Sequence, residues 1–259
     1  MTRADSLDDD LELAQRLADA ADALTLARFR AQDLHVDAKP DLTPVSDADL
    51  AVEDEVRRLL AAERPDDAVL GEEHGVTGEG PRQWVVDPID GTKNFVRGVP
   101  VWATLIALLV DGVVTVGVVS APGLGRRWWA ARGRGAFADG HPIRVSSVSS
   151  LSDAHLSYSS LTGWEALGRL DGLLELSRKC WRTRAFGDFW SHVLVAEGAV
   201  DASFEPEVSL WDLAPLQVIV EEAGGRFTSL AGEARPDGGS VVCSNGLLHD
   251  EVLTGLAAG

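Results

Sequence analysis

The spacing of apolar and polar residues predicts that the chain begins with two helices. Apolar residues recur at helical intervals from about Leu11 to Phe29, which is typical of an amphipathic helix. A polar loop with two prolines follows at 39–46. Ser46 or Asp47 is a suitable cap for a second helix that runs to about Ala62.

Short apolar runs then predict a set of strands in the middle of the chain. They lie at Ala68–Leu70, Trp84–Val86, Trp102–Val110, Val113–Ser120 and Trp128–Ala131. Asp111-Gly112 interrupts the most apolar stretch of the sequence between two β-branched runs. This pattern indicates a hairpin turn rather than a membrane span.

The second half of the chain alternates between the two kinds of element. Strands are expected at 155–159, 182–185, 202–204, 226–228 and 241–244, and helices at 164–177, 189–197, 213–223 and 247–256. Early antiparallel strands followed by alternation predict an α/β chain with two sheets. We place an N-terminal lobe at residues 1–149, which carries most of the candidate metal ligands, and a C-terminal lobe at 150–259.

The charge of the chain changes the picture of its partners. A formal net charge of -18 argues against a nucleic-acid partner, because a phosphate backbone would be repelled by most of the surface. A small phosphorylated metabolite is compatible with this charge if bound cations supply local positive charge. Cys180 and Cys243 form neither a disulfide framework nor a CxxC motif, and residues 1–30 contain no signal peptide. We therefore expect a cytoplasmic protein without a membrane partner.

Acidic residues at the ends of predicted strands carry the main chemical signal. Glu72 follows one short strand, Asp87 and Asp90 follow another, and Asp212 opens a predicted helix. Buried carboxylates are costly unless a cation pairs with them, and Mg²⁺ prefers such hard oxygen ligands. Pro88 bends the chain so that its two neighbouring aspartates face one place. Together the four acids supply enough oxygen for two ions.

Each of these acids also has an ordinary structural interpretation. Asp212 is suited to capping a helix, Glu72-Glu73 to a solvated loop and Asp90-Gly91 to a turn. Each interpretation is reasonable for one residue alone. Their occurrence together in one order favours the metal site.

The residues that follow Asp90 are suited to binding phosphate. Gly91 lets backbone N–H groups approach an anion, and Thr92 offers a hydroxyl that can orient a water. Asp49, on the second predicted helix, is a candidate partner for that hydroxyl. Its ordinary interpretation is an exposed acid that stabilises the first helical turn.

Several segments of the sequence together resemble the inositol monophosphatase family. They are Asp41–Asp49, Gly71–Glu73, Trp84–Phe95, Gly198–Asp201, Trp211–Ala214 and Glu222–Gly225. A closer resemblance to the actinobacterial histidinol-phosphate phosphatases of this family rests on Asp41–Asp49, Lys93–Trp102, Arg126–Trp129 and Arg184–Phe189. The resemblance covers nearly the whole chain. It implies a layered αβαβα sandwich, a homodimer, and hydrolysis of L-histidinol phosphate in histidine biosynthesis.

The resemblance also implies roles for individual residues. Glu72, Asp87 and the Ile89 carbonyl would hold one Mg²⁺, and Asp87, Asp90 and Asp212 a second. Asp49 and Glu72 would bear on a third, more weakly held ion, and Mn²⁺ is an alternative metal. The phosphate would contact Asp90, Gly91 and Thr92. The residues expected to face the alcohol part of the substrate are Arg184, Asp188, Glu205, Asp212 and Asn245.

These roles lead to a mechanistic hypothesis and leave alternative functions open. Thr92 and Asp49 would orient and deprotonate the attacking water while Glu72 anchors its metal. An inositol-1-monophosphatase, or a phosphatase for another small metabolite, would share this machinery. A sugar bisphosphate would require a second basic cluster, for which arginines such as Arg97 and Arg184 are candidates. An inactive regulatory binding protein is a further alternative, although no metal carboxylate is missing.

Overall fold

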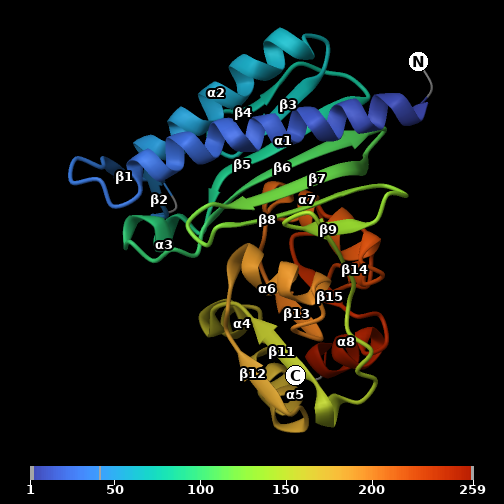
Figure 1. Ribbon diagram of the computed structural model, residues 1–259. Helices are drawn as coiled ribbons and strands as arrows, with labels where there is room; N and C mark the ends of the chain where they lie inside the picture. Colours follow the sequence, from blue (N-terminus) through green and yellow to red (C-terminus); the bar gives the residue numbers. More distant parts are fainter. Residues whose placement is uncertain (1–2, 41, 258–259) are drawn as a thin grey trace.

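The structure is a computed structural model that describes residues 3–40 and 42–257. Asp41, the first residue of one family-like segment, lies outside the described residues. The elements stack in the order αβαβα, so the predicted layered sandwich is confirmed (Figure 1). Helices α1 (Arg3–Arg28) and α2 (Asp47–Glu63) form the first layer. No helix in the described ranges is both long and apolar enough to cross a membrane.

The larger sheet forms the second layer and has eight strands in the order β10-β9-β8-β7-β6-β5-β3-β4. Neighbouring strands are antiparallel except for β3 and β5, which run parallel. Their bounds are β3 (Ala68–Gly71), β4 (Gly75–Thr77), β5 (Arg82–Asp90), β6 (Ala103–Val110), β7 (Val113–Ala121), β8 (Arg126–Ala131), β9 (Ala136–Ala138) and β10 (His141–Ile143). Val110 pairs with Val113 across Asp111-Gly112, which confirms the predicted hairpin turn.

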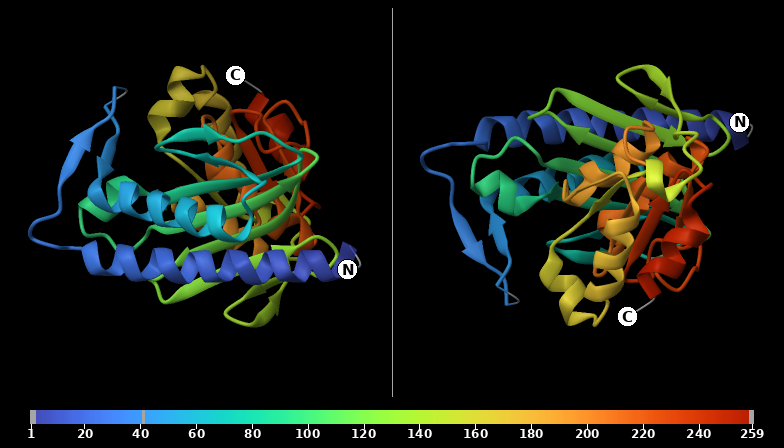
Figure 2. Two further views of the ribbon diagram at one scale, coloured as in Figure 1. Left: turned by 90° about the horizontal axis from the view of Figure 1, so that it is seen from above. Right: turned by 90° about the horizontal axis from the view of Figure 1, so that it is seen from below.

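Apolar faces of α1 and α2 cover one side of this sheet. Leu13 and Leu17 of α1 and Val52 of α2 are buried against sheet residues such as Trp84 and Ile106. Burying this apolar stripe removes several large side chains from water and stabilises the layer. A two-stranded hairpin, β1 (Val36–Ala38) and β2 (Pro44–Ser46), projects beside these helices (Figure 2).

The third layer, α6 (Asp188–Ala196) and α7 (Leu210–Glu222), lies between the two sheets (Figure 1). Consecutive residues of α7 from Leu213 to Val220 are buried, as expected of a helix covered on all sides. Helix α7 approaches β7 closely at Gly117. A Cβ atom at this glycine would lie 2.6 Å from the Pro215 carbonyl oxygen and 2.6 Å from Val218 Cγ1. The glycine therefore permits direct contact between helix and strand.

The second sheet and its outer helices complete the sandwich. The five strands follow the order β12-β11-β13-β15-β14, in which β12 is an edge. Their bounds are β11 (His155–Tyr158), β12 (Arg182–Arg184), β13 (Ala202–Glu205), β14 (Arg226–Thr228) and β15 (Val241–Ser244). The outer layer contains α4 (Leu161–Ala166), α5 (Leu170–Lys179) and α8 (His249–Ala257), and a 3₁₀ turn, η1 (Leu151–Asp153), precedes β11.

One helix prediction was wrong, and several short strands were not predicted. The helix expected at 164–177 is two helices, because Gly168, two residues after the end of the first, adopts a φ of 73° and stops it from continuing. The unpredicted strands β1, β2, β4, β9 and β10 have three residues each. In the sequence, the strands of the larger sheet all precede residue 144 and those of the smaller sheet all follow residue 154. In space, however, α7 packs on both sheets. The division into two lobes therefore stays a proposal.

Candidate active site

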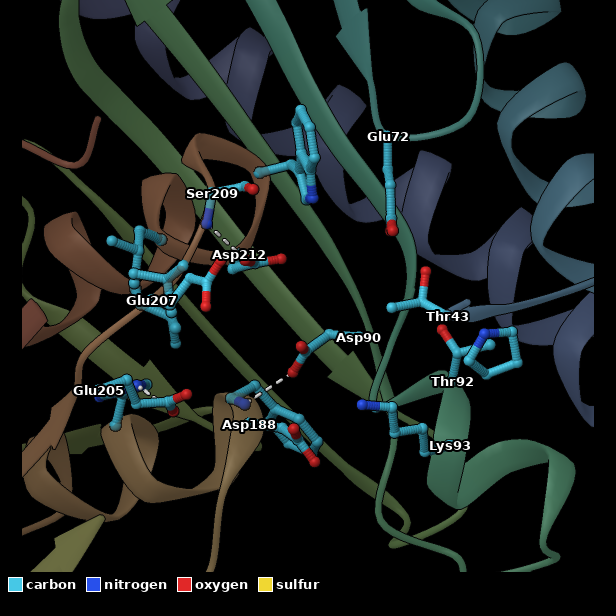
Figure 3. Close-up of a pocket in the computed structure, with 18 of the residues that line it drawn as sticks. Thr43, Glu72, Asp90, Thr92, Lys93, Asp188, Glu205, Glu207, Ser209 and Asp212 are labelled. Atoms are coloured by element: carbon cyan, nitrogen blue, oxygen red, sulfur yellow. Dashed lines mark hydrogen bonds and ion pairs between the residues drawn. The ribbon is translucent and has the colours of Figure 1, made fainter. Parts of the chain in front are cut away.

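A cavity of about 710 Å³ lies where the two halves of the chain meet. Its lining combines the loops around β2 and β3, the end of β5, and the N-terminal parts of α6 and α7. Figure 3 shows the side chains of Glu72, Asp90 and Asp212 directed into the same space. The other polar residues that line it are Lys39, Thr43, Thr92, Lys93, Asp188, His192, Glu205, Glu207 and Ser209.

An irregularity in β5 brings two aspartates to one side of the strand. The pairing between β5 and β6 shifts register between Asp87 and Asp90. The Pro88 carbonyl accepts a 2.7 Å hydrogen bond from Thr104 Oγ1, and the Ile89 side chain is buried in a separate apolar cluster. The predicted bend at Pro88 is thus a β-bulge that re-aims side chains.

The third aspartate comes from the start of α7. Ser209, not Asp212, occupies the cap position of this helix. Asp212 is the third helical residue, and its Oδ2 accepts a 2.7 Å hydrogen bond from the Ser209 backbone N–H. The simple interpretation of Asp212 as the cap is therefore corrected: this reciprocal contact orients its carboxylate while the other oxygen remains available.

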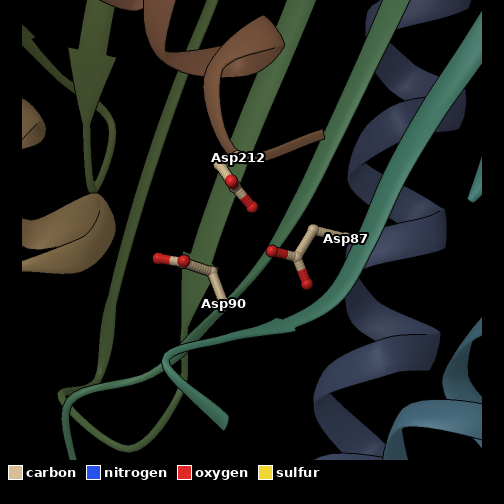
Figure 4. A group of neighbouring side chains, drawn as sticks. All are labelled: Asp87, Asp90 and Asp212. Carbon is tan, nitrogen blue, oxygen red and sulfur yellow. The ribbon is translucent and has the colours of Figure 1, made fainter. Parts of the chain in front are cut away.

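The three aspartates form a compact group of oxygen ligands (Figure 4). One carboxylate oxygen from each of Asp87, Asp90 and Asp212 lies within 4.8 Å of the others. Burial, followed by the negative charges of neighbouring acids, raises the pKa of Asp87 and Asp90 well above the usual value. Burial and the charges of nearby acids, partly offset by the Ser209 N–H, raise the pKa of Asp212 to about 7.

This group fits a hard divalent cation. Mutual repulsion and burial both penalise the ionised carboxylates, and a bound cation relieves both penalties. The donor atoms are all oxygen, the type that Mg²⁺ and Mn²⁺ prefer. Asp87, Asp90 and Asp212 therefore have the chemistry to hold such an ion.

Glu72 lies near these three aspartates, on a turn that is held in place by contacts with Lys39 and Glu53. Lys39 Nζ lies 2.7 Å from Glu72 Oε1 and 2.7 Å from Glu73 Oε1. The buried Glu53 carboxylate accepts hydrogen bonds from the backbone N–H groups of Glu73, at 2.7 Å, and His74, at 3.1 Å. The Glu72-Glu73 segment is thus a fixed, partly buried turn, and its interpretation as a solvated loop is corrected.

Asp49 is buried behind Thr92 rather than exposed in its helical turn. Its Oδ2 accepts hydrogen bonds from the N–H and hydroxyl of Ser46. Its Oδ1 lies 3.5 Å from Thr92 Oγ1, which donates a shorter 2.9 Å bond to the Ile89 carbonyl. Burial raises the pKa of Asp49 to about 6, and the negative charge of Glu72 adds to this effect. The predicted pair is therefore adjacent, although its contact is long.

The segment expected to bind phosphate begins the short helix α3 (Thr92–Val96). Gly91 caps this helix with a φ of 81°. A Cβ atom there would lie 3.1 Å from the Val101 carbonyl oxygen, so this position requires glycine for both conformation and space. Gly91 and Thr92 line the cavity next to Asp90, which is itself one of the three grouped aspartates.

The remaining wall of the cavity is rich in acids. Asp188 and Glu205 line it together with Glu207, and Lys93 points inward from the opposite side of the cavity (Figure 3). Asp188 adopts a φ of 50°, and its Oδ2 accepts a 3.2 Å hydrogen bond from Asn94 Nδ2. Burial and the charge of Glu205 raise the pKa of Asp188 to about 6.

Comparison with known proteins identifies the family. The sequence profile described as the inositol monophosphatase family matches residues 6–258. The chain belongs to this family. The predicted family resemblance is thus confirmed.

Two relatives of this family member, both named histidinol-phosphatase, are from actinobacteria, as the sequence analysis expected. The protein of Mycobacterium tuberculosis is 65% identical over 97% of this chain and 99% of its own. The protein of Streptomyces coelicolor is 60% identical over 95% of this chain and 96% of its own. A solved structure of the extragenic suppressor protein SuhB from Bartonella henselae is 28% identical, with a TM-score of 0.90 over 97% of this chain and 99% of that one.

Two expected substrate residues of this family member lie outside the cavity. Arg184 is exposed on the edge strand β12 and donates a hydrogen bond to the carbonyl of its own neighbour Thr183. Asn245 is buried, and its side-chain oxygen accepts hydrogen bonds from the N–H groups of Leu247 and Leu248. Asn245 therefore caps a turn before α8, which is the other interpretation of an Asn-Gly pair.

The cavity also contains residues that sequence reasoning did not assign. Lys39, Lys93, His192 and Glu207 line it, and Glu53 supports one of its turns. Lys93 lies within the Asp-Gly-Thr-Lys segment, so the phosphate motif itself was a usable signal. The other four carry no local sequence signal, because their positions depend on how distant elements pack.

Proposed function

We propose that this protein is a metal-dependent phosphatase that hydrolyses L-histidinol phosphate to L-histidinol and phosphate, a step of histidine biosynthesis. The observation that carries this proposal is the division of one cavity into two acidic parts. One part, with Asp87, Asp90 and Asp212, suits metal ions and phosphate. The other includes Asp188 and Glu205, which line the same cavity and would face the alcohol part of the substrate.

The second acidic part matches the chemistry of histidinol. This alcohol carries an ammonium and an imidazole, both of which can donate charge-assisted hydrogen bonds to carboxylates. The two actinobacterial relatives that share 65% and 60% of their residues with this chain carry the name histidinol-phosphatase. Asp188, Glu205 and Asp212 are the residues that we propose face the substrate beyond its phosphate.

We propose two or three Mg²⁺ ions per site, with Mn²⁺ as an alternative. Asp87, Asp90 and Asp212 would hold one ion, and Glu72, Asp87 and the Ile89 carbonyl another. Asp49 and Glu72 would bear on a third. When bound, the ions supply positive charge that neutralises the phosphate oxygens and lower the pKa of the attacking water.

The protein's own residues would position that water and the phosphate. Thr92 Oγ1 lies between the Asp49 carboxylate and the Ile89 carbonyl, so its hydroxyl can orient a water at the cavity wall. Asp49, with a pKa raised to about 6, is suited to accept a proton from that water near neutral pH. The α3 N-terminus at Gly91 and Thr92 would donate backbone N–H groups to the phosphate.

A bisphosphate substrate is less well supported. Arg126 pairs with Asp139 and Glu197, and Arg127 pairs with Asp22. The cavity lining includes none of these arginines, and it includes neither Arg97 nor Arg184. Among the described residues, the basic side chains that line the cavity are Lys39, which is paired with Glu72 and Glu73, and Lys93, so the arginine cluster considered for a second phosphate does not form there. Inositol-1-phosphate, which has a single phosphate, stays the alternative substrate.

We also propose a cytoplasmic homodimer, following the family resemblance. Trp181, next to the edge strand β12, is 67% exposed, and an exposed tryptophan beside an unpaired strand edge suits an interface between two copies. Cys180 and Cys243 are unpaired thiols, which suits a reducing compartment. Mass measurement in solution, at twice the chain mass for a dimer, tests the assembly.

The proposed activity is tested by phosphate release from the purified protein. L-histidinol phosphate and inositol-1-phosphate are compared side by side with Mg²⁺, and a chelator serves as control. We expect a much higher kcat/KM for L-histidinol phosphate and complete loss with chelator. A preference for inositol-1-phosphate would overturn the proposed substrate. Release of phosphate from neither compound would leave a phosphatase for another small metabolite or the regulatory binding protein.

A further inference from the structure

His192 is a buried polar residue in the wall of the cavity that the mechanism above does not use. It lies on α6 between the two sheets, and its side chain is 2% exposed. Its Nδ1 lies 2.8 Å from Ser203 Oγ and its Nε2 lies 3.1 Å from Glu205 Oε1. Both ring nitrogens therefore have a partner, which fixes the ring plane and its direction.

Glu205 depends on this contact for its position. It ends strand β13, and in the described part of the chain His192 is the one hydrogen-bond partner of its carboxylate. Asp188 and Asp212 share the cavity, and like charge would push a flexible glutamate away from them. A donated imidazole N–H holds one oxygen and leaves the other for a ligand.

Ser191, the residue before His192 on α6, makes a buried polar contact that is purely structural and serves for comparison. Ser191 is fully buried, and its hydroxyl lies 2.8 Å from that of Ser157. This pair does not line the cavity, whereas His192 and Glu205 do. A buried polar ring is costly without its bonds, so its placement at the cavity indicates a role there.

We infer that His192 is a positioning residue that fixes the Glu205 carboxylate to receive a cationic group on the alcohol part of the substrate. This inference rests on the proposed function and deepens it. His192 would act through Glu205, while the phosphate would lie beside Asp87, Asp90 and Asp212 in the other part of the cavity. The pair therefore sets the preference for a positively charged alcohol over a neutral one and leaves phosphate chemistry unchanged.

The consequence can be measured with two substituted enzymes and a matched control. His192→Leu removes both ring hydrogen bonds, whereas His192→Gln keeps an amide N–H for Glu205. Ser191→Ala removes a buried polar contact one residue away. Each enzyme is assayed with Mg²⁺ on L-histidinol phosphate, whose alcohol is cationic, and on inositol-1-phosphate, whose alcohol is neutral.

We expect His192→Leu to raise KM for L-histidinol phosphate about tenfold or more, with kcat within about threefold, because a charge-assisted contact is weakened. KM for inositol-1-phosphate should not rise. His192→Gln should restore most of the preference, and Ser191→Ala should leave it unchanged. In a Glu205→Gln background, His192→Leu should cause no further change in preference.

Equal losses on both substrates, or a preference unchanged by His192→Leu, would overturn the inference while leaving the proposed function intact. A wild-type enzyme that prefers inositol-1-phosphate would overturn both. If His192→Leu does not fold, as judged by circular dichroism, the decision rests on the His192→Gln and Glu205→Gln enzymes. Glu205→Gln must then lose the preference for the cationic substrate, and His192→Gln must retain it.

Discussion

The backbone N–H of Phe189 donates a 2.6 Å hydrogen bond to Asp90 Oδ2. Asp90 ends a strand of the larger sheet, whereas Phe189 belongs to the first turn of α6. A carboxylate of the proposed metal site therefore also satisfies a backbone donor at the start of a helix from the second half of the chain. Asp90 therefore contributes to the packing of the two halves as well as to the proposed metal site.

Replacement of Asp90 by asparagine should separate these two roles. Asparagine can still accept the Phe189 N–H, but it removes the charge proposed to bind metal. We expect kcat to fall by about three orders of magnitude or more at saturating Mg²⁺, while the thermal midpoint of the chelated protein stays level or rises. Asp171→Asn, at an exposed position of α5, is the matched control. Near-normal turnover of Asp90→Asn would remove Asp90 from the metal site.

Stability without metal should depend on pH in an unusual direction. Burial and neighbouring charge raise the pKa of Asp49 and Asp188 from 3.8 to about 6, and that of Asp212 to about 7. Because the folded state holds these protons more tightly than the unfolded state, their contribution to stability is full below about pH 4. It is lost as pH rises through 6 to 7.

Denaturation of the chelated protein between pH 4.5 and 8 measures this effect, with the same series in Mg²⁺ as control. We expect the free energy of unfolding to decrease with rising pH in chelator, and the added stability from Mg²⁺ to increase over the same range. A chelated protein that becomes steadily more stable towards pH 8 would contradict the raised pKa values.

Gly71→Ala should disturb the turn that presents Glu72. A Cβ atom at Gly71 would lie 2.0 Å from Glu53 Oε1, which is buried and bonded to the turn. We expect a loss of about 1–3 kcal/mol in the free energy of unfolding and weaker activation by Mg²⁺. Urea denaturation and Mg²⁺ titration of activity measure the two effects.

A double mutant tests whether Glu53 is the cause. Glu53→Ala alone removes the acceptor for two backbone N–H groups and should itself be destabilising. In that background Gly71→Ala should add less than about 0.5 kcal/mol, since the clash has been removed. Additive losses in the double mutant would mean that Gly71 acts through another contact.

Asp188→Asn should weaken recognition of the alcohol more than catalysis. It keeps an acceptor for the Asn94 side chain but removes a charge from the acidic wall. We expect KM for L-histidinol phosphate to rise about tenfold and kcat to change little, since one charge-assisted contact is lost. Steady-state kinetics check this, with inositol-1-phosphate as the control substrate. A fall in kcat on both substrates would instead place Asp188 near the reacting phosphate.

The sequence predicted the fold well wherever periodicity extended over many residues. The first two helices and the long strands from Trp84 to Ala131 follow from their apolar patterns. Three-residue strands such as β9 carry too few positions for any period to show. The break at Gly168 within the helix expected at 164–177 was not predicted. A glycine can either continue a helix or end it, and contacts with neighbouring elements determine which occurs.

The candidate site was predictable where its residues lie close together in sequence. Asp87, Asp90 and Thr92 lie within six consecutive positions, and their spacing indicated a shared site. Lys39 and His192 could not be found in this way, because each meets its partner only after distant elements pack together. Arg184 was predicted to face the substrate, but its position on an edge strand depends on the strand order of the second sheet, which the sequence alone does not show.

The close contact of α7 with Gly117 makes the proposed metal site sensitive to a residue that lies outside it. Asp212 lies three residues before Pro215, the point of contact, or about 4.5 Å along the helix axis. Any side chain at Gly117 would push the helix away from the sheet and move Asp212 relative to Asp87 and Asp90. The absence of a side chain at Gly117 thus sets the distance between the Asp212 carboxylate on the helix and those of Asp87 and Asp90 on the sheet.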